Sequence, residues 1–172
     1  DIMDWYYILA ICLGALILLV LLISYICFKM TFYSKDRDFS TDKIEFPDDG
    51  FYKPYKEIAT KHIMIARQMP HKELSVKSYD GLTLKGNYFE KSKGAPIEIM
   101  VHGYKGSGER DLSIGIERAF RCDRNALVID QRAAGHSEGN VITFGIKESK
   151  DILCWIDKVI EDFLEQIIKN IL

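Results

Sequence analysis

The chain has 172 residues, of which 23 are Lys or Arg and 25 are Asp or Glu, so its formal net charge is −2. A balance this close to neutral excludes a basic surface for nucleic acid and an acidic, solvating tail. With 28% charged and 48% hydrophobic residues, most of the chain is expected to fold as an ordinary globular domain. No nucleic-acid partner is therefore expected.

Residues 5–28 contain no charged side chain. A helix rises about 1.5 Å per residue and the hydrocarbon core of a bilayer is about 30 Å thick, so roughly 20 apolar residues span it. Trp5, Tyr6 and Tyr7 lie at one end, where aromatic rings favour the headgroup level. The run is too long for a signal peptide, and no small-x-small cleavage site follows it. Residues 1–28 are therefore predicted to form a single-pass anchor whose partner is the lipid bilayer.

The charges beside this segment predict its orientation. Asp1 and Asp4 precede it, whereas Lys29, Lys35 and Arg37 follow it. Because Lys and Arg favour the cytoplasmic side of a membrane, the rest of the chain is expected in the cytoplasm. The chain begins with Asp rather than Met, and preceding basic residues would reverse this prediction.

Residues 29–72 are predicted to form a juxtamembrane connector that several prolines interrupt. A short helix is expected near residues 55–67, where Ile58, Ile63 and Ile65 supply an imperfect apolar face. This helix is expected to pack on the following domain rather than to carry chemistry.

Residues 73–172 are predicted to form an α/β domain. Apolar and polar residues alternate on both sides of Asp80-Gly81, a pattern typical of a β-hairpin because Gly accepts the positive φ of a tight turn. Residues 97–101 form a short apolar run and are predicted to be a buried strand. A glycine-rich loop follows this strand.

Three further elements are expected after that loop: a helix at about 111–121, a second buried strand at 126–129, and a long amphipathic helix over 149–172. In the last of these, apolar pairs recur about every four residues. Strands that alternate with helices indicate a parallel sheet wound by right-handed crossovers. The expected fold class is therefore α/β.

Several common sites are not supported. The glycine-rich loop has the Gly103-x-x-x-x-Gly108 spacing of a phosphate-binding loop, but Glu109 and Arg110 stand where Lys and Ser or Thr are needed. The dinucleotide-binding pattern fails as well. The four His and four Cys show no metal-type spacing. Neither a metal nor a cofactor is therefore expected.

Residues 135–139, GHSEG, fit the formula G-x-S-x-G of a nucleophile elbow. The elbow requires a strand, a sharp turn and a helix in direct succession. Here the strand ends near Asp130, four residues intervene, and no helix start follows. Ser137 is therefore predicted not to be the nucleophile. Asp130 and Arg132 lie where open α/β sheets bind ligands, and they are interpreted as an ion pair that holds the loop.

A strand ending in His-Gly and a D-x-R-x-x-G-x-S-x-G loop after the next strand resemble the α/β-hydrolase superfamily. Within it, the chain is most similar to the membrane-anchored, serine-aminopeptidase-like (ABHD-type) hydrolases of bacteria. The resemblance covers roughly residues 70–163. Its motif residues are His102, Gly103, Asp130, Arg132, Gly135, Ser137 and Gly139.

The resemblance implies the N-terminal half of a doubly wound α/β-hydrolase sheet, preceded by one transmembrane helix. It also implies that the backbone N–H of Tyr104 is an oxyanion donor, a group whose removal costs on the order of 10²–10³ in rate elsewhere. The intact relative would hydrolyse an ester, thioester or amide in a small molecule, lipid or peptide through a Ser–His–acid triad without metal or cofactor.

In that family the nucleophilic Ser follows the fifth strand, and the acid and His come later. The fifth strand is expected from about residue 165, but residues 164–172 do not resemble it. The chain is therefore expected to be a truncated fragment that is inactive as given. Two alternatives stay open: a non-catalytic, membrane-tethered pseudo-hydrolase or binding protein, and an enzyme that uses Ser137 together with a partner chain. Without a fifth strand, the strand at 97–101 is expected to keep a bare edge that favours aggregation.

Overall fold

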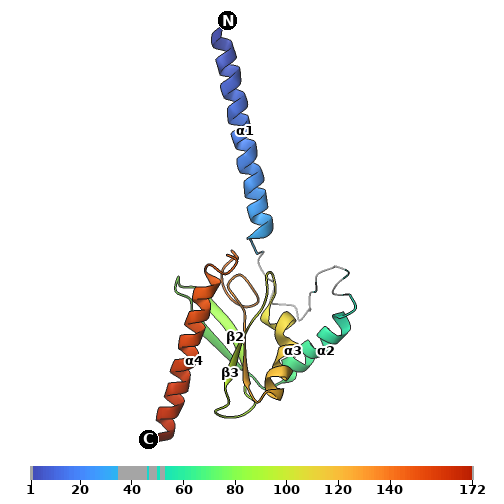
Figure 1. Cartoon of the computed structure of the whole chain (residues 1–172), viewed down its shortest axis with the longest axis vertical. Helices are drawn as coiled ribbons and strands as arrows, with labels where there is room; N and C mark the ends of the chain where they lie inside the picture. The colour runs from blue at the N-terminus through green and yellow to red at the C-terminus, as the bar shows by residue number, and fades with distance from the viewer. Residues whose placement is uncertain (1, 35–45, 47–49, 51–52, 172) are drawn as a thin grey trace. The chain divides into compact units, whose positions relative to one another are not determined.

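The computed structural model describes residues 2–34, 46, 50 and 53–171, with only the backbone described at residues 2–3 and 163–171. The chain divides into two compact units, residues 1–33 and 34–172. The first unit contains helix α1 (Ile2–Thr31), and the second contains a mixed α/β domain (Figure 1). The domain boundaries predicted at residues 28 and 72 stay predictions.

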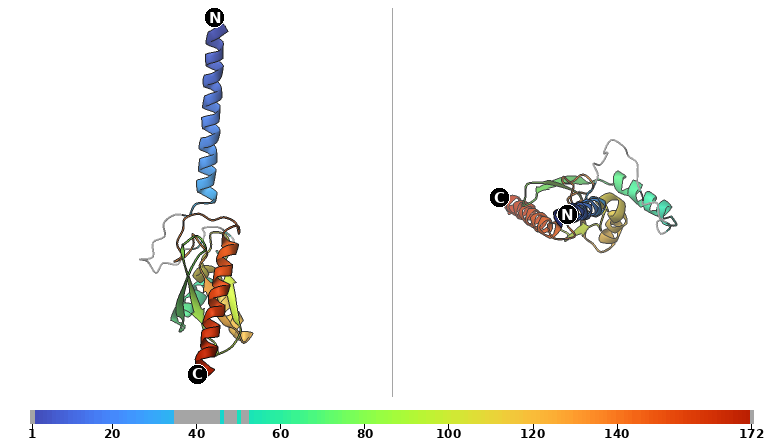
Figure 2. Two further views of the ribbon diagram at one scale, coloured as in Figure 1. Left: turned by 90° about the vertical axis from the view of Figure 1, so that its left-hand side faces the viewer. Right: turned by 90° about the horizontal axis from the view of Figure 1, so that it is seen from above.

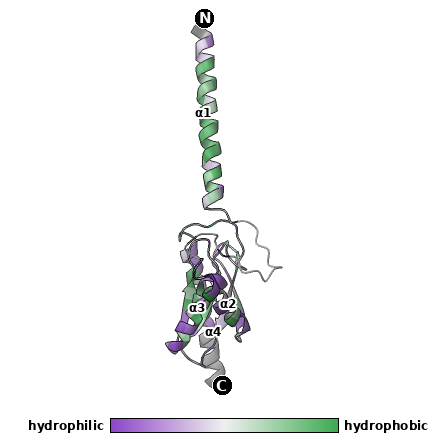
Figure 3. Cartoon of the chain, turned by 90° about the vertical axis from the view of Figure 1, so that its right-hand side faces the viewer, coloured by the Kyte–Doolittle hydropathy of each residue, from purple (hydrophilic) through white to green (hydrophobic). Residues whose placement is uncertain are grey.

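Helix α1 contains the apolar segment that the sequence singles out. Asp4–Thr31 is long and apolar enough to cross a membrane, and hydrophobic residues occupy most of its length (Figure 3). A core helix of a soluble protein or a signal sequence near an N-terminus can also be long and apolar enough for this. Asp4 in the first turn and Lys29 in the last turn oppose the helix dipole favourably.

The domain begins with a helix and a β-hairpin. Helix α2 (Lys56–Gln68) precedes β1 (Lys72–Lys77), which pairs antiparallel with β2 (Thr83–Phe89). The predicted hairpin is confirmed, and Gly81 in its turn has a φ of 92°. Ser78 closes the turn, because its backbone N–H donates to the Leu82 carbonyl at 2.8 Å.

The four strands of the described sheet run in the order β1-β2-β4-β3. Strand β3 (Ile97–Val101) is parallel to β4 (Asn125–Ile129), and α3 (Gly108–Arg121) connects them. Strand β2 pairs antiparallel with β4, so the predicted parallel pairing holds for β3 and β4 alone. In this sheet β3 lies at an edge, and the aggregation expected from that edge stays a prediction. Helix α4 (Glu148–Ile171) follows.

Helices cover both faces of the sheet (Figures 1 and 2). Trp155 of α4 is fully buried against Leu127 and Ile129. On the other face, α2 and α3 pack on the sheet through a cluster that includes Ala126 and Val128. Alternate residues of β4 thus face opposite helices, which explains why a continuous apolar run, rather than an alternating one, encodes this strand.

Two sequence predictions need correction here. Helix α3 begins at Gly108 rather than near 111, because the Ser107 side chain accepts a hydrogen bond from the Arg110 N–H and caps the helix. In α2 the buried residues are Ile63 and Ala66, whereas Ile58 and Ile65 are about half exposed. Residues three apart share a helix face, so the predicted apolar face is confirmed at Ile63 and wrong at Ile58 and Ile65. Connector residues 35–45, 47–49 and 51–52 lie outside the described residues.

Candidate active site

A cavity of about 260 Å³ opens at the carboxyl ends of β3 and β4. Ligands of open α/β sheets bind at this edge of the sheet. The loop after β3, the loop after β4 and the segment that begins α4 all contribute to its walls. The lining residues are His102, Gly103, Tyr104, Lys105, Gln131, Arg132, Ala134, Ile142, Phe144, Gly145 and Glu148.

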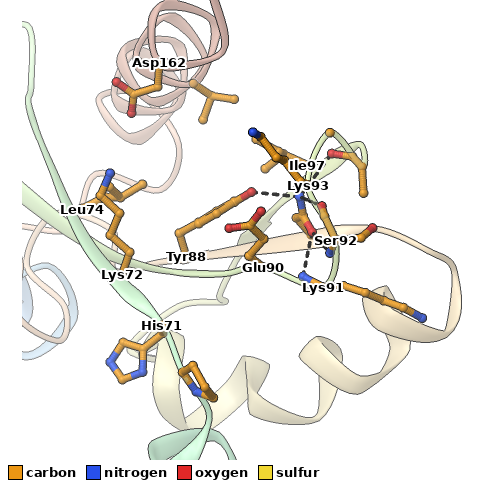
Figure 4. Close-up of a pocket in the computed structure, with 15 residues that line it drawn as sticks. His71, Lys72, Leu74, Tyr88, Glu90, Lys91, Ser92, Lys93, Ile97 and Asp162 are labelled. Carbon is orange, nitrogen blue, oxygen red and sulfur yellow. Dashed lines mark hydrogen bonds between the residues drawn. The ribbon is translucent and has the colours of Figure 1, made fainter. Parts of the chain in front are cut away.

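A larger cavity, of about 630 Å³, lies at the opposite ends of the same strands (Figure 4). One of its polar lining residues, Asn125, is buried, and its side chain is already hydrogen-bonded. The side-chain oxygen of Asn125 accepts the backbone N–H of Lys91 at 2.8 Å, and its side-chain NH₂ group donates to the Tyr88 hydroxyl at 2.9 Å. These bonds hold the β2–β3 connection in place and give Asn125 a structural role. The smaller cavity, which lies at the carboxyl ends of the strands, is therefore the better candidate site.

His102 closes β3 and is held by both ring nitrogens. Nε2 accepts the backbone N–H of Gln131 at 3.1 Å, so the ring proton must lie on Nδ1. Nδ1 then donates to the Gly103 carbonyl at 2.8 Å. The ring is 6% exposed. His102 therefore joins the ends of β3 and β4, and its geometry gives it a structural role rather than that of a general base.

The loop after β3 turns sharply beside this ring. The Gly106 N–H donates to the Gly103 carbonyl at 3.1 Å. A Cβ on Gly106 would lie 1.9 Å from a carboxylate oxygen of Asp111, so any other residue there would force the Asp111 side chain to move. Tyr104 sits inside this turn, and its ring stacks on that of Phe144 with centroids 4.9 Å apart. The oxyanion role of the Tyr104 backbone N–H stays a prediction.

Asp130 ends β4 and fastens two segments to it. One carboxylate oxygen accepts the N–H of Gly108 at 2.8 Å, and the other accepts the N–H of His136 at 2.9 Å. Gly135 has a φ of 44° and its missing Cβ would lie about 2 Å from this carboxylate. A side chain at position 135 would collide with the Asp130 carboxylate, and this close contact explains the Gly of the D-x-R-x-x-G motif.

Ser137 lies within the G-x-S-x-G segment but is only 1% exposed. Its hydroxyl donates to the Asp130 carbonyl at 2.6 Å and accepts the Lys85 N–H at 2.8 Å. The next residue, Glu138, donates its N–H to the Thr83 carbonyl at 2.9 Å. The loop after β4 is thereby fastened along β2. This geometry gives Ser137 a structural role.

Arg132 makes different ion pairs from the one expected. Its guanidinium is 3% exposed and binds both carboxylate oxygens of Asp151 at 2.7 Å and both of Asp80 at 3.0 Å. The predicted Asp130–Arg132 pair is therefore wrong, because the carboxylate of Asp130 binds backbone N–H groups instead. Arg132 joins the hairpin turn, the loop after β4 and α4.

The ion pairs of Arg132 shift the pKa values of two of the residues involved. Hydrogen bonds from Arg132 and Ser78 hold the pKa of Asp80 well below its usual range. The Asp151 carboxylate in turn raises the pKa of Arg132. Both directions stabilise the charged forms, so Asp80 and Arg132 stay ionised at neutral pH.

Glu148 is the buried acid on the cavity wall. Burial raises the pKa of its carboxyl group, but hydrogen bonds from Thr143 and Gly145 outweigh burial and lower it overall. Its oxygens accept the N–H and hydroxyl of Thr143 at 2.7 and 2.6 Å and the N–H of Gly145 at 2.8 Å. Glu148 thus fixes the loop that precedes α4.

No model of a known protein family and no curated protein matches the chain. Solved structures do: the esterase Pf2001 of Pyrococcus furiosus matches in two crystal forms, each with 24% identity and a TM-score of 0.52. The match covers 61% of this chain and 39% of the esterase chain in one form, and 60% and 40% in the other. An alpha-beta hydrolase from Vibrio vulnificus matches with 14% identity and a TM-score of 0.46, over 77% of this chain and 49% of its own. The chain has an α/β-hydrolase fold.

The fold class predicted from sequence is therefore confirmed. The chain spans about two fifths of the esterase's length. Within the α/β-hydrolase fold, the cavity at the carboxyl ends of β3 and β4 is lined by His102, Gly103 and Tyr104, the residues that the resemblance singles out.

Sequence reasoning missed the partners of Arg132 and the buried position of Glu148. A signal for both was present. The apolar stripe of α4 runs through Trp155, and one turn or two before it the same face carries Asp151 and Glu148. An acid on a buried helix face needs a partner, and this pattern could have indicated one.

Proposed function

We propose that this chain is the N-terminal, oxyanion-binding part of a serine hydrolase that transfers an acyl group from an ester, thioester or amide to water. The observation that carries the proposal is the cavity at the carboxyl ends of β3 and β4 in an α/β-hydrolase fold. The similarity in fold to an esterase supports this reaction class, because ester hydrolysis is one such transfer of an acyl group to water.

In the proposed chemistry the loop after β3 supplies a single hydrogen-bond donor. The Tyr104 backbone N–H would donate to the oxygen that becomes negatively charged in the tetrahedral intermediate. His102 would hold this loop against β4 through its Gln131 contact, so that the donor keeps its direction. Such acyl transfer uses a Ser–His–acid arrangement and requires no metal ion.

In this proposal Ser137 is not the nucleophile, because its hydroxyl is buried and donates to the Asp130 carbonyl. The 172-residue chain by itself would then be inactive, and the nucleophile of the active protein would follow a further strand. A non-catalytic, membrane-tethered pseudo-hydrolase is the alternative that the same geometry supports.

We further propose that α1 anchors the protein in a bilayer as a single span, with the domain in the cytoplasm. The length and apolar composition of Asp4–Thr31 support the span. The bias of positive charge towards Lys29, Lys35 and Arg37 supports the orientation. The serine-aminopeptidase-like subtype and a lipid, peptide or small-molecule substrate belong to the same proposal.

The decisive experiment compares two proteins by labelling with a fluorophosphonate, which reacts only with an activated Ser. One is the 172-residue chain, and the other is the product of the parent gene read in all frames past the codon for Leu172. The proposal expects no labelling of the first protein and labelling of the second. Labelling of the 172-residue chain that disappears in Ser137→Ala would refute it, and a longer product that stays unlabelled would favour the pseudo-hydrolase.

A further inference from the structure

Four apolar side chains stand exposed beside the mouth of the candidate site. Tyr104 is 50% exposed, Val141 38%, Phe144 56% and Ile146 75%, and these four residues are called the apolar rim below. Tyr104 follows β3, and the other three belong to the loop that precedes α4. Exposed apolar patches of this kind mark interaction sites on proteins.

The rim is held in its exposed position by the backbone around it. Phe144 adopts a φ of 50°, which is uncommon for a residue with a side chain. The Glu148 carboxylate accepts N–H groups from Thr143 and Gly145, on either side of Phe144. Because this turn is fixed from within, the Phe144 ring faces outward and stacks on Tyr104.

Positive charge flanks the rim. The Lys105 ammonium lies 5.3 Å from the centre of the Tyr104 ring. Lys147 directly follows Ile146, and Lys150 lies in the first turn of α4, 4.7 Å from the centre of the Tyr79 ring. The nearby acids are engaged: Glu148 binds its own loop, and Asp80 binds Arg132 and, at 3.3 Å, Lys147. Exposed aromatic and aliphatic side chains with Lys beside them suit the headgroup region of an anionic bilayer.

A hydrogen bond ties the rim loop to the chain that emerges from α1. The Ser34 N–H donates to the carbonyl of Asn140, the residue before Val141, at 2.9 Å. Ser34 is the third residue after Thr31, where α1 ends. Three residues extend over at most about 10 Å. The hydrogen bond of Ser34 therefore lies only a short length of chain away from the candidate membrane segment.

We propose that the apolar rim docks on the anionic surface of the bilayer that α1 crosses, so that the mouth of the candidate site faces the membrane. This inference rests on the proposed anchor and goes beyond it, because it assigns a second, separate membrane contact to the α/β domain. A bilayer fits the rim better than a protein partner does, for two reasons. Lysines flank the rim and would attract anionic lipid, and the rim loop is bonded to Ser34, which lies close along the chain to α1.

The test measures how strongly nitroxide-labelled lipid quenches an environment-sensitive fluorophore attached to one position of the full chain at a time. The chain is reconstituted in vesicles of phosphatidylcholine and phosphatidylglycerol that contain the nitroxide-labelled lipid. The rim is labelled through Ile146→Cys. Matched controls are Lys93→Cys, at the opposite ends of the strands, and Leu16→Cys within α1. The native thiols are first removed by Cys12→Ala, Cys27→Ala, Cys122→Ser and Cys154→Ala.

The proposal expects nitroxide lipid to quench the label at Ile146 several-fold more than the label at Lys93. It also expects this quenching to fall when phosphatidylglycerol is omitted and in the double variant Lys147→Gln, Lys150→Gln. Quenching at Ile146 no greater than at Lys93 would overturn the proposal. A blue-shifted but unquenched label at Ile146 would overturn it as well, because protein rather than lipid would then cover the rim.

The label at Leu16 separates this inference from the proposed anchor. If Leu16 is quenched and Ile146 is not, the anchor stands and the rim inference fails. If Leu16 is not quenched, the anchor fails, and quenching at Ile146 still decides whether the rim binds lipid.

Discussion

The loops after β3 and after β4 both carry glycine-rich motifs, but they use them differently. In the loop after β4, the side chains of Asp130, Arg132 and Ser137 make hydrogen bonds within the protein. They fasten this loop to the start of α3, to α4 and to β2, respectively. The loop after β3 instead presents the half-exposed Tyr104 at the cavity, which Gln131, Arg132 and Ala134 of the loop after β4 also line. Although both loops border the cavity, the polar side chains of the G-x-S-x-G loop are used to hold segments together, whereas the loop after β3 leaves an exposed aromatic ring at the cavity.

The largest expected effect comes from the loop after β4. Arg132→Ala would leave the buried Asp151 carboxylate without its cation, and breaking such a pair costs about 3–5 kcal/mol of unfolding free energy. Urea unfolding of the full chain in detergent measures the change. A matched Arg110→Ala variant, whose cation is more exposed, is expected to cost far less. Equal losses in the two variants would contradict the role assigned to Arg132.

Ser137→Ala tests whether this serine is structural. The substitution leaves the Lys85 N–H and the Asp130 carbonyl without their partner, which is expected to cost about 1–3 kcal/mol. The same urea experiment measures it. A variant as stable as the unsubstituted chain would show that the hydrogen bonds of Ser137 do not hold the loop.

Ser107→Ala is the corresponding change in the loop after β3. Its side chain caps α3 by accepting the Arg110 N–H at 3.3 Å, and loss of such a cap costs about 1 kcal/mol. The expected loss is therefore smaller than for Ser137→Ala, and the order of the two urea midpoints checks it. A lower urea midpoint for Ser107→Ala than for Ser137→Ala would contradict the stronger structural role assigned to the loop after β4.

The pH dependence of stability is expected to be the smallest effect. The pKa of Asp80 lies below its ordinary value of 3.8 in the folded chain, so the folded state binds this proton more weakly than the unfolded state. The stabilisation is therefore complete above that ordinary pKa and is lost as the pH falls below it. Urea midpoints measured from neutral to acidic pH should fall less steeply in Asp80→Asn than in the unsubstituted chain. Parallel curves would exclude Asp80 as the source.

Much of the fold could be predicted because its signals are local. The alternation around Asp80-Gly81, the apolar runs of β3 and β4 and the periodicity of α4 each lie within one segment, and each element is confirmed. The partners of Arg132 could not be read in this way, since Asp80 and Asp151 lie 52 and 19 residues from it. Position in the folded sheet, rather than local pattern, brings them together.

The candidate site divides along the same line. His102 and Tyr104 were identified because a strand ending in His-Gly is a local pattern. The contribution of Phe144 and Glu148 was missed, because the loop before α4 reaches the cavity only through the packing of α4 on the sheet.

The most direct test of the account concerns the Tyr104 backbone N–H in a protein that the fluorophosphonate labels. Tyr104→Pro removes this donor, whereas Tyr104→Phe keeps it and changes only the side chain. The account predicts that kcat/KM for ester hydrolysis falls about 10²- to 10³-fold in Tyr104→Pro, with correct folding checked by circular dichroism, and stays near the original value in Tyr104→Phe. A folded Tyr104→Pro variant with unchanged kcat/KM would contradict the placement of the oxyanion donor in the loop after β3.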